Sequence, residues 1–261
     1  MKALRIAASG MMAQEMNVEL ISNNVANMRT TGFKRQRADF QDLLYQDMRR
    51  VGTQTSESGN LLPTGVQIGS GVRTAATPRI HSQGTLTATE KETDVAVRGE
   101  GYFRVLMPDG RTAYTRDGSF ELDARGTLVT ADGWTVDPAI TVPANSSGLT
   151  INAQGVVQVT VGNSSTPTTI GQIQLARFVN KSGLEAIGNN LFLETAASGA
   201  PQIASPSDEG YGSLVQAHLE AGNVNSVAEI SDLIAAQRAY EMNSRVIRAA
   251  DEMMSASVSP K

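Results

Sequence analysis

The sequence predicts an α+β protein whose N- and C-terminal helices pair as a coiled coil, with an extended arm and a mainly antiparallel β body between them. Three observations support this fold. Both ends carry long apolar patterns with helical spacing, a Gly- and Ser-rich stretch follows the first pattern, and the middle alternates short apolar runs with turn glycines. We expect a helical domain of residues 1–30 with 217–261, a connecting arm at 31–71 and an outer β domain at 72–216.

The N-terminal pattern is a heptad seam. Apolar residues recur in alternating steps of three and four, which is typical of a helix that packs along another long helix, and Gln14 interrupts the pattern. A helix over 3–28 would be about 40 Å long at 1.5 Å per residue. The seam consists of Leu4, Ala7, Met11, Val18, Ile21, Val25 and Met28.

The C-terminal pattern repeats this spacing, and no glycine or proline falls between Asn223 and Ser259 to stop a helix. The two seams predict that the terminal helices pair with each other. The alternative is that each helix packs separately on the β body. The second seam consists of Leu233, Ala236, Tyr240, Asn243, Ile247, Ala250 and Met254.

The stretch 52–71 is rich in Gly, Ser, Thr and Gln and has no helical period, as in a flexible linker. Its end, "GVQIGSGVRT", alternates and favours an extended arm that contacts neighbouring molecules. Leu61, Leu62, Val66 and Ile68 would be the anchors of this arm. A solvated linker is the alternative.

The β body shows a meander pattern. Glycines at 110, 118, 126 and 133 separate the short runs "YFRVLM", "RTAYTR", "SFEL" and "TLVT", and three of these glycines follow an aspartate. Asp-Gly is a strong hairpin signal, so each glycine predicts a tight turn. Further strands are expected in 149–161, with a turn at Gly155, and in 170–179.

Composition excludes several classes of function. The net charge of −4 and pI near 5.3 argue against nucleic-acid binding, and no run approaches the roughly 20 apolar residues that insert into a membrane. The chain has no cysteine, hence no disulfide or thiol nucleophile. Lys2 and Arg5 precede an apolar run, but polar residues follow it without a cleavage pattern, which argues against a cleaved signal peptide.

Catalytic, cofactor and metal motifs are missing from the pattern. His81 and His218 are separated by the whole β body, which leaves no His/Cys zinc site, and no nucleophile elbow occurs. The aspartates that precede turn glycines fit hairpins better than calcium loops. We therefore expect no enzyme activity, no cofactor and no metal. An exported enzyme or ligand-binding protein that its helices merely oligomerise is the alternative of a different class.

Two terminal motifs resemble one known family. The stretch "SNNVANMRTTGFKR" (22–35) resembles the N-terminal signature of the flagellar axial proteins, the rod and hook subunits, and includes Lys34. The stretch "NVNSVAEISDLIAAQRAYEMNSRVI" resembles the matching C-terminal signature, centred on Gln237, Arg238, Tyr240, Glu241 and Asn243. Segments such as "LPTGVQIGSGVR" and "PDGRTAYTRDGSF" extend the resemblance over nearly the whole chain, and it is strongest to subunits of the distal rod.

The resemblance implies a structural subunit of a helical homopolymer, with the terminal helices forming an inner tube around an export channel. It also implies export by the flagellar type III apparatus without signal cleavage, and a place in the basal body across the periplasm and outer-membrane zone. The implied partners are further copies, proximal rod subunits, hook or hook-junction subunits, and the surrounding L and P rings. A hook or proximal-rod subunit is the alternative within the family.

The polar end of the first helix has a physical interpretation. Asn23 and Asn27 share a helix face with Asn24 beside it, and their amides could bond carbonyls of adjacent helices and fix register. Gly32 would end the helix and Phe33 would anchor the turn in an apolar pocket. An ordinary capped helix end is the alternative.

Overall fold

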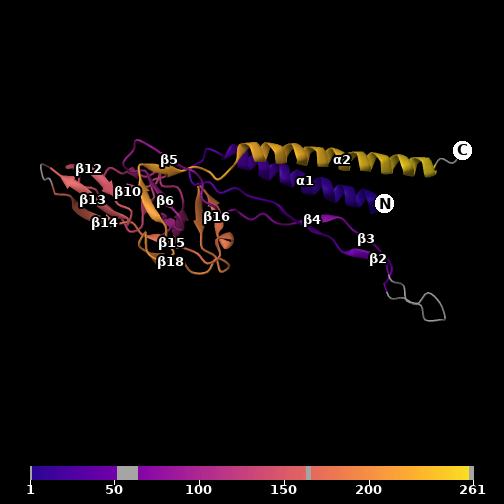
Figure 1. The fold of residues 1–261 in the computed structure, drawn as a ribbon, viewed down its shortest axis with the longest axis horizontal. Coiled ribbons are helices and arrows are strands. Elements are labelled where there is room, and N and C mark those ends of the chain that lie inside the picture. Colours follow the sequence, from indigo (N-terminus) through magenta and orange to yellow (C-terminus); the bar gives the residue numbers. More distant parts are fainter. Residues whose placement is uncertain (1, 52–63, 163–165, 259–261) are drawn as a thin grey trace. The chain divides into compact units, whose positions relative to one another are not determined.

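The structure is a computed structural model that describes residues 2–51, 64–162 and 166–258 (Figure 1). In this part of the chain two long helices, α1 (Lys2–Ala26) and α2 (Ser226–Val258), precede and follow a mainly antiparallel β body in the sequence, so the predicted α+β class is confirmed. Two compact units are present. The helical unit comprises the described residues of Met1–Val25, Gln36–Pro78 and Asn225–Lys261, and the β unit those of Ala26–Arg35 and Arg79–Val224.

The two helices lie side by side and antiparallel, with the start of α1 and the end of α2 at the same end of the pair (Figure 1). Near that end a Cβ at Gly10 would lie 2.8 Å from Nδ2 of Asn243. Near the other end Nδ2 of Asn24 donates to Oε2 of Glu229 at 3.2 Å. The helices therefore contact each other within one chain, while a supercoiled coiled-coil geometry stays a prediction.

The arm differs from a single extended segment because its backbone is paired. Strand β1 (Asp39–Asp42) pairs antiparallel with β4 (Val72–Ala76), and β2 (Tyr45–Arg49) with β3 (Val66–Gly69). An extended chain gains these ladder hydrogen bonds by folding back, since otherwise its N–H and C=O groups would depend on solvent. The chain runs out and back as one hairpin, which includes residues 72–76 that we had expected in the β body.

The observed units have other bounds than the three predicted segments, because the hairpin belongs to the helical unit and the turn after α1 belongs to the β unit. A functional division into assembly domain, arm and outer domain stays a prediction. Strand β20 (His218–Glu220) differs in the same way at the second boundary, since it lies in the β unit although 217–261 was assigned to the helical domain.

Nine described strands form the largest sheet, in the order β16-β17-β8-β7-β11-β10-β9, with β15 pairing both β7 and β18. Its strands are β7 (Tyr102–Leu106), β8 (Thr112–Thr115), β9 (Glu121–Leu122), β10 (Leu128–Val129), β11 (Thr135–Val136), β15 (Leu175–Arg177), β16 (Glu185–Gly188), β17 (Leu191–Leu193) and β18 (Gln202–Ala204).

Smaller sheets complete the β unit. Three strands pair in the order β12-β13-β14, β19 pairs with β6, and β20 pairs with β5, all antiparallel. A short 3-10 turn, η1 (Lys181–Gly183), precedes β16. These strands are β5 (Leu86–Ala88), β6 (Val95–Arg98), β12 (Ser146–Ile151), β13 (Val156–Val161), β14 (Thr168–Gln172), β19 (Ser213–Gln216) and β20 (His218–Glu220).

Most of the predicted hairpin glycines are confirmed. Gly110, Gly126, Gly133 and Gly155 have φ near +80° between antiparallel neighbours. Gly118 is the exception, because it lies where the chain leaves β8 and a Cβ there would come 1.7 Å from the carbonyl oxygen of Val95. The prediction of a hairpin at Gly118 is wrong: glycine permits close backbone approach there instead of a turn.

The β unit buries a core of its own. The largest cluster joins side chains from β6, β7, β12, β13, β15 and β19, with Phe103 and Phe120 in edge-to-face contact at 5.1 Å between ring centroids. A second cluster contains Tyr102, Tyr114 and Phe192. Alternation along the strands therefore satisfies the core without using either long helix.

Candidate assembly interface

The C-terminal turn of α1 is held by Asn24, which is 1% exposed. Its Nδ2 donates to the carbonyl of Gln36 and its Oδ1 accepts from the N–H of Gln36, both at 2.9 Å. A third bond from Nδ2 reaches Glu229 in the first turn of α2. One buried amide thus ties the end of α1 to the returning chain and to α2, all within a subunit.

The other two asparagines of this turn are placed differently. Asn23 is exposed and Asn27 is half-buried, with Oδ1 of Asn27 accepting from the hydroxyl of Thr30 at 3.1 Å. Bonds from Asn23 and Asn27 to helices of neighbouring copies stay a prediction. Sequence reasoning did not distinguish Asn24 as the internal amide, because spacing alone does not show which face turns inward.

The turn that follows α1 requires glycine. Gly32 has φ +69°, its N–H donates to the carbonyl of Glu220 at 2.7 Å, and a Cβ there would lie 2.7 Å from the backbone nitrogen of Asp117. Phe33, next in the chain, is buried at 8% exposure. The "TGF" part of the motif therefore docks the chain against the strand that leads toward α2.

Lys34 forms a buried ion network with Glu220 and Arg116. Its Nζ lies 2.6 Å from Oε1 of Glu220 and also donates to the carbonyl of Ser82 at 2.9 Å. Nε of Arg116 donates to Oε2 of Glu220 at 2.8 Å, and the N–H of Gly84 donates to Oε1 at 2.8 Å. Lys34 and Glu220 are each 1% exposed, and Arg116 is 5% exposed.

These contacts determine the electrostatics of the network. Burial would raise the pKa of the Glu220 carboxyl, but the charges of Arg116 and Lys34 outweigh burial and lower it. Burial lowers the pKa of the Lys34 ammonium, whereas the negative charge of Glu220 acts to raise it.

Lys34 is enclosed in the β unit, so this residue serves the subunit's own fold and offers no surface for another copy. Sequence reasoning missed Glu220 and Arg116, because an ion pair across 186 residues leaves no local pattern.

Asn223 and Asn225 prepare the start of α2. In the β unit Oδ1 of Asn223 accepts from the N–H of Arg35 at 2.8 Å, while its Nδ2 donates to the carbonyl of Ile80 at 2.7 Å. In the helical unit Oδ1 of Asn225 accepts from the N–H of Val227 at 3.1 Å, as an N-cap does. The "NVN" of the C-terminal motif is therefore a pair of structural amides.

The predicted seams face inward along both helices. Ala7 and Ile21 are buried, as are Ala236 and Ala250, and most other seam residues are half-buried. Tyr240 is the exception in α2 at 44% exposure, and Met28 lies after the end of α1 at 36%. The half-buried members are Leu4, Met11, Val18, Val25, Leu233, Asn243, Ile247 and Met254.

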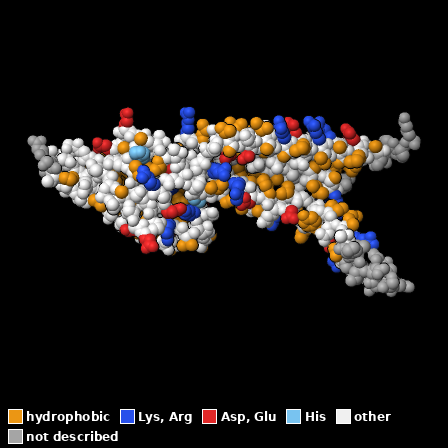
Figure 2. Space-filling model, in the orientation of Figure 1, with side chains coloured by type: hydrophobic (Ala, Val, Ile, Leu, Met, Phe, Trp, Pro, Cys, Tyr) orange, Lys and Arg blue, Asp and Glu red, His pale blue; other side chains and the backbone are white. Residues whose placement is uncertain are grey.

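The same helices also expose apolar side chains away from the seams, and Figure 2 shows hydrophobic side chains gathered over α1 and α2. The charged and polar motif residues Gln237, Arg238 and Glu241 lie among them, exposed. Sequence reasoning missed this second face, although the steps from Val227 to Ile230 and Ile234 are helical. The exposed set is Met12, Met16, Val227, Ile230, Ile234, Met242, Val246 and Met253.

The hairpin adds further exposed apolar side chains. Of its predicted anchors, Val66 is 50% and Ile68 36% exposed, while Leu61 and Leu62 lie outside the described residues. Leu44 at 88% and Met48 at 67% are more exposed still. Large apolar side chains on a two-stranded hairpin have no core of their own to enter. They are contact candidates in an assembly.

Groups suited to chemistry are sparse in the described part of the chain. No cluster of three or more His, Cys, Asp or Glu is placed to hold a metal in residues 2–51, 64–162 and 166–258. Asp109 and Asp123 instead accept N–H bonds from their own turns. Neither described helix combines the length and apolarity that crossing a lipid bilayer requires.

Long terminal helices that are apolar on two faces, joined to a β unit with a closed core, define a subunit of a larger assembly. The flagella basal body rod protein model matches residues 4–34, the flagellar hook protein FlgE/F/G D1 domain model matches 96–159, and the flagellar basal body rod FlgEFG C-terminal model matches 215–259.

Full-length relatives identify the family. The chain is 57% identical over 256 residues to the flagellar basal-body rod protein FlgG of Caulobacter vibrioides, covering 98% of each chain. It is 49% identical to FlgG of Agrobacterium fabrum and 48% identical to FlgG of Borreliella burgdorferi, with at least 96% of each chain covered. The chain belongs to the FlgG family of flagellar basal-body rod proteins, a structural family of the basal body.

Proposed function

We propose that this chain is the structural subunit of the distal rod, a helical homopolymer that forms a rigid drive shaft and encloses an export channel between the proximal rod and the hook. The exposed apolar faces of α1 and α2 carry this proposal. In the monomer the apolar side chains on the second face of each helix remain in contact with water. Complete burial of one such side chain contributes about 1.5–3 kcal/mol of favourable free energy. Further copies of the same chain would cover it.

The β unit supports the same function in another way. Its core is closed without the helices, so it can remain folded while the helices exchange partners during assembly. We propose that the helices form the inner tube, that the β unit contacts the L and P rings, and that proximal rod and hook-junction subunits bind the two ends of the polymer. Export through the flagellar type III apparatus without signal cleavage, into the periplasm and outer-membrane zone, completes the proposal.

A hook or proximal-rod subunit is the competing function within the family. Identity favours the rod, since the chain is 46–57% identical to several FlgG proteins but 26% identical to the hook-basal body complex protein FlhP of Bacillus subtilis. The FlgG of that same organism is 36% identical.

Polymerisation of matched variants tests the proposal. Replacing Ile234 by Glu places a charge on the exposed face of α2, whereas Val179→Glu, at 82% exposure in the β unit, is the matched control. Electron microscopy should show helical tubes for the parent and for Val179→Glu. Ile234→Glu should raise the concentration needed for tubes at least about tenfold, which is about 1.4 kcal/mol per contact. Equal assembly of both variants would refute an interface built from the helix faces.

A further inference from the structure

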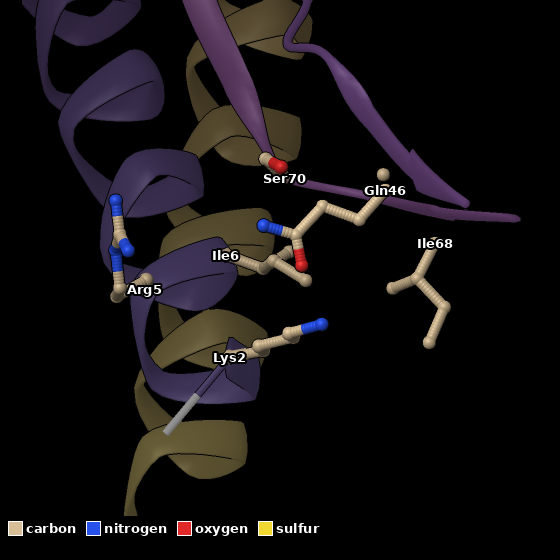
Figure 3. Close-up of a pocket in the computed structure, with 7 residues that line it drawn as sticks. Lys2, Arg5, Ile6, Gln46, Ile68 and Ser70 are labelled. Carbon is tan, nitrogen blue, oxygen red and sulfur yellow. The ribbon is translucent and has the colours of Figure 1, made fainter. Parts of the chain in front are cut away.

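A cavity of about 110 Å³ lies between the first turns of α1 and the hairpin strands β2 and β3 (Figure 3). In Figure 3 Lys2 extends from α1 toward the hairpin, and the amide of Gln46 extends back toward α1. For scale, a cavity of about 150 Å³ holds a benzene molecule. The side chains that concern us are Lys2, Arg5, Ile6, Gln46, Ile68 and Ser70.

The charge at this cavity is unbalanced. Lys2 and Arg5 are exposed and form no ion pair within the described residues. They occupy the N-terminal end of α1, whose first turn contains no acidic residue. The helix dipole disfavours cations at this end and favours carboxylates. The cavity therefore favours a carboxylate as its ligand. The two cations, the N-terminal end of the helix and the amide N–H groups of Gln46 all interact favourably with a negative charge.

The same helix offers carboxylates further along its length. Glu15 and Glu19 are exposed and make no ion pair within 2–51, 64–162 and 166–258, and exposed Met12 and Met16 adjoin them. Glu15 and Glu19 follow Lys2 and Arg5 by 10 to 17 residues, which is about 15–25 Å along the helix axis at 1.5 Å per residue. The cationic and acidic groups of one α1 are therefore too far apart to pair within one copy.

We propose that the cavity beside Lys2 and Arg5 receives the Glu15 and Glu19 face of α1 from a second copy of this chain. This contact rests on the proposed homopolymer, in which all copies point the same way and every contact joins two different surfaces. An axial offset of about 20 Å, 13 residues at 1.5 Å, brings Lys2 level with the second copy's acidic face. Met16 of that face then lies within about one helical turn of Ile6, at the apolar rim that Ile6 and Ile68 form.

Zero-length carbodiimide cross-linking tests this contact in polymers grown from equal amounts of ¹⁵N-labelled and unlabelled full-length chain. The chain has few lysines, and Lys34 is buried, so Lys2 products are readily assigned. We expect peptides joining Lys2 to Glu15 or Glu19, with about half carrying mixed isotopes. The matched control is Lys91 with Glu121, which pair inside one chain and should give unmixed peptides only.

Charge exchange provides the second arm. Lys2→Glu with Arg5→Glu, and separately Glu15→Lys with Glu19→Lys, should each raise the critical concentration for polymerisation at least about tenfold. All four changes in one chain should bring it back to within about threefold of the parent. A parent that polymerises without Lys2 cross-links, or without rescue by the exchange, overturns this contact and leaves the polymer intact. A parent that never polymerises overturns the proposed function itself.

Discussion

The Nζ atom of Lys34 lies 2.6 Å from Oε1 of Glu220, and the two side chains are almost completely buried. This pair joins the motif after α1 to the strand that precedes α2. It therefore fixes where the chain leaves the β unit toward each end. Arg116 binds the other carboxylate oxygen, so a single buried carboxylate is shared by two cations that are enclosed in the protein.

Lys34→Met should destabilise the β unit by about 1–3 kcal/mol, because it removes the bonds to Glu220 and Ser82 while Arg116 still balances the carboxylate. Urea unfolding followed by tryptophan fluorescence or circular dichroism would measure the change. Glu220→Gln should cost more, about 3–5 kcal/mol, because two buried cations then lose their counter-charge. The double variant should be less destabilised than the sum of the two single variants, and strict additivity would show that the pair is not coupled.

Acidification should weaken the β unit through His81. Burial, then the charges of Lys34, Lys181 and Arg79, lowers the pKa of His81 to about 4, and its Nδ1 lies 2.8 Å from the hydroxyl of Tyr102. Below about pH 6.5 His81 binds a proton in the unfolded chain but stays neutral in the folded chain. The free energy of unfolding therefore decreases progressively from pH 6.5 down to about 4.

His81→Gln removes this titration. The stability of the parent should fall more steeply than that of the variant between pH 6.5 and 4, measured by urea unfolding at each pH. Below that window carboxylates such as Glu220 dominate both proteins. Parallel curves for the parent and the variant between pH 6.5 and 4 would contradict the assignment to His81.

Two glycines should respond in opposite ways to alanine. At Gly118 a Cβ would overlap the carbonyl of Val95, and we expect a loss above about 3 kcal/mol from forced backbone movement. At Gly148 nothing lies within 4 Å and φ is not positive, so alanine should be neutral or stabilise by up to about 1 kcal/mol. Thermal melts of both variants would decide, and equal effects would refute the packing account.

The terminal helices should exchange amide hydrogens quickly in the monomer. Among the residues of α2 whose side chains the structure describes, up to position 256, the buried ones are Glu229, Ala236 and Ala250. This is little apolar burial for a helix of 33 residues. Hydrogen exchange with mass spectrometry should show fast amides in both helices and slow ones in the β unit. On polymerisation the helices should become protected. If the amides of α1 and α2 in a monodisperse monomer are as protected as those of the β unit, the prediction of fast exchange is wrong.

Deleting residues 46–71 should yield polymers that bend. The deletion leaves β1 and β4 paired with a short connection, so α1 and α2 keep their attachment to the chain. It removes Met48, Val66 and Ile68, exposed side chains that we expect to resist sliding between neighbours. Persistence length from electron micrographs is the measurement. If the variant forms tubes as straight as those of the parent, the hairpin only connects its neighbouring elements and does not stiffen the polymer.

The sequence by itself determined the elements whose signals are local. Heptad spacing predicted both helices and gave the bounds of α1 to within two residues, and turn glycines placed most of the predicted hairpins. Both signals are local, because helix faces and tight turns depend on neighbours three to four residues apart. Motif resemblance likewise identified the family that the full-length relatives confirm.

Only the tertiary structure decided the roles that depend on distant partners. It placed Lys34 in a buried ion pair with Glu220, chose Asn24 over its neighbours as the internal amide, and folded the arm back on itself. It also showed that α1 and α2 are apolar on a second, exposed face. Each of these follows from which groups meet across tens to hundreds of residues, and a one-dimensional pattern does not encode such contacts because side-chain burial depends on the whole fold.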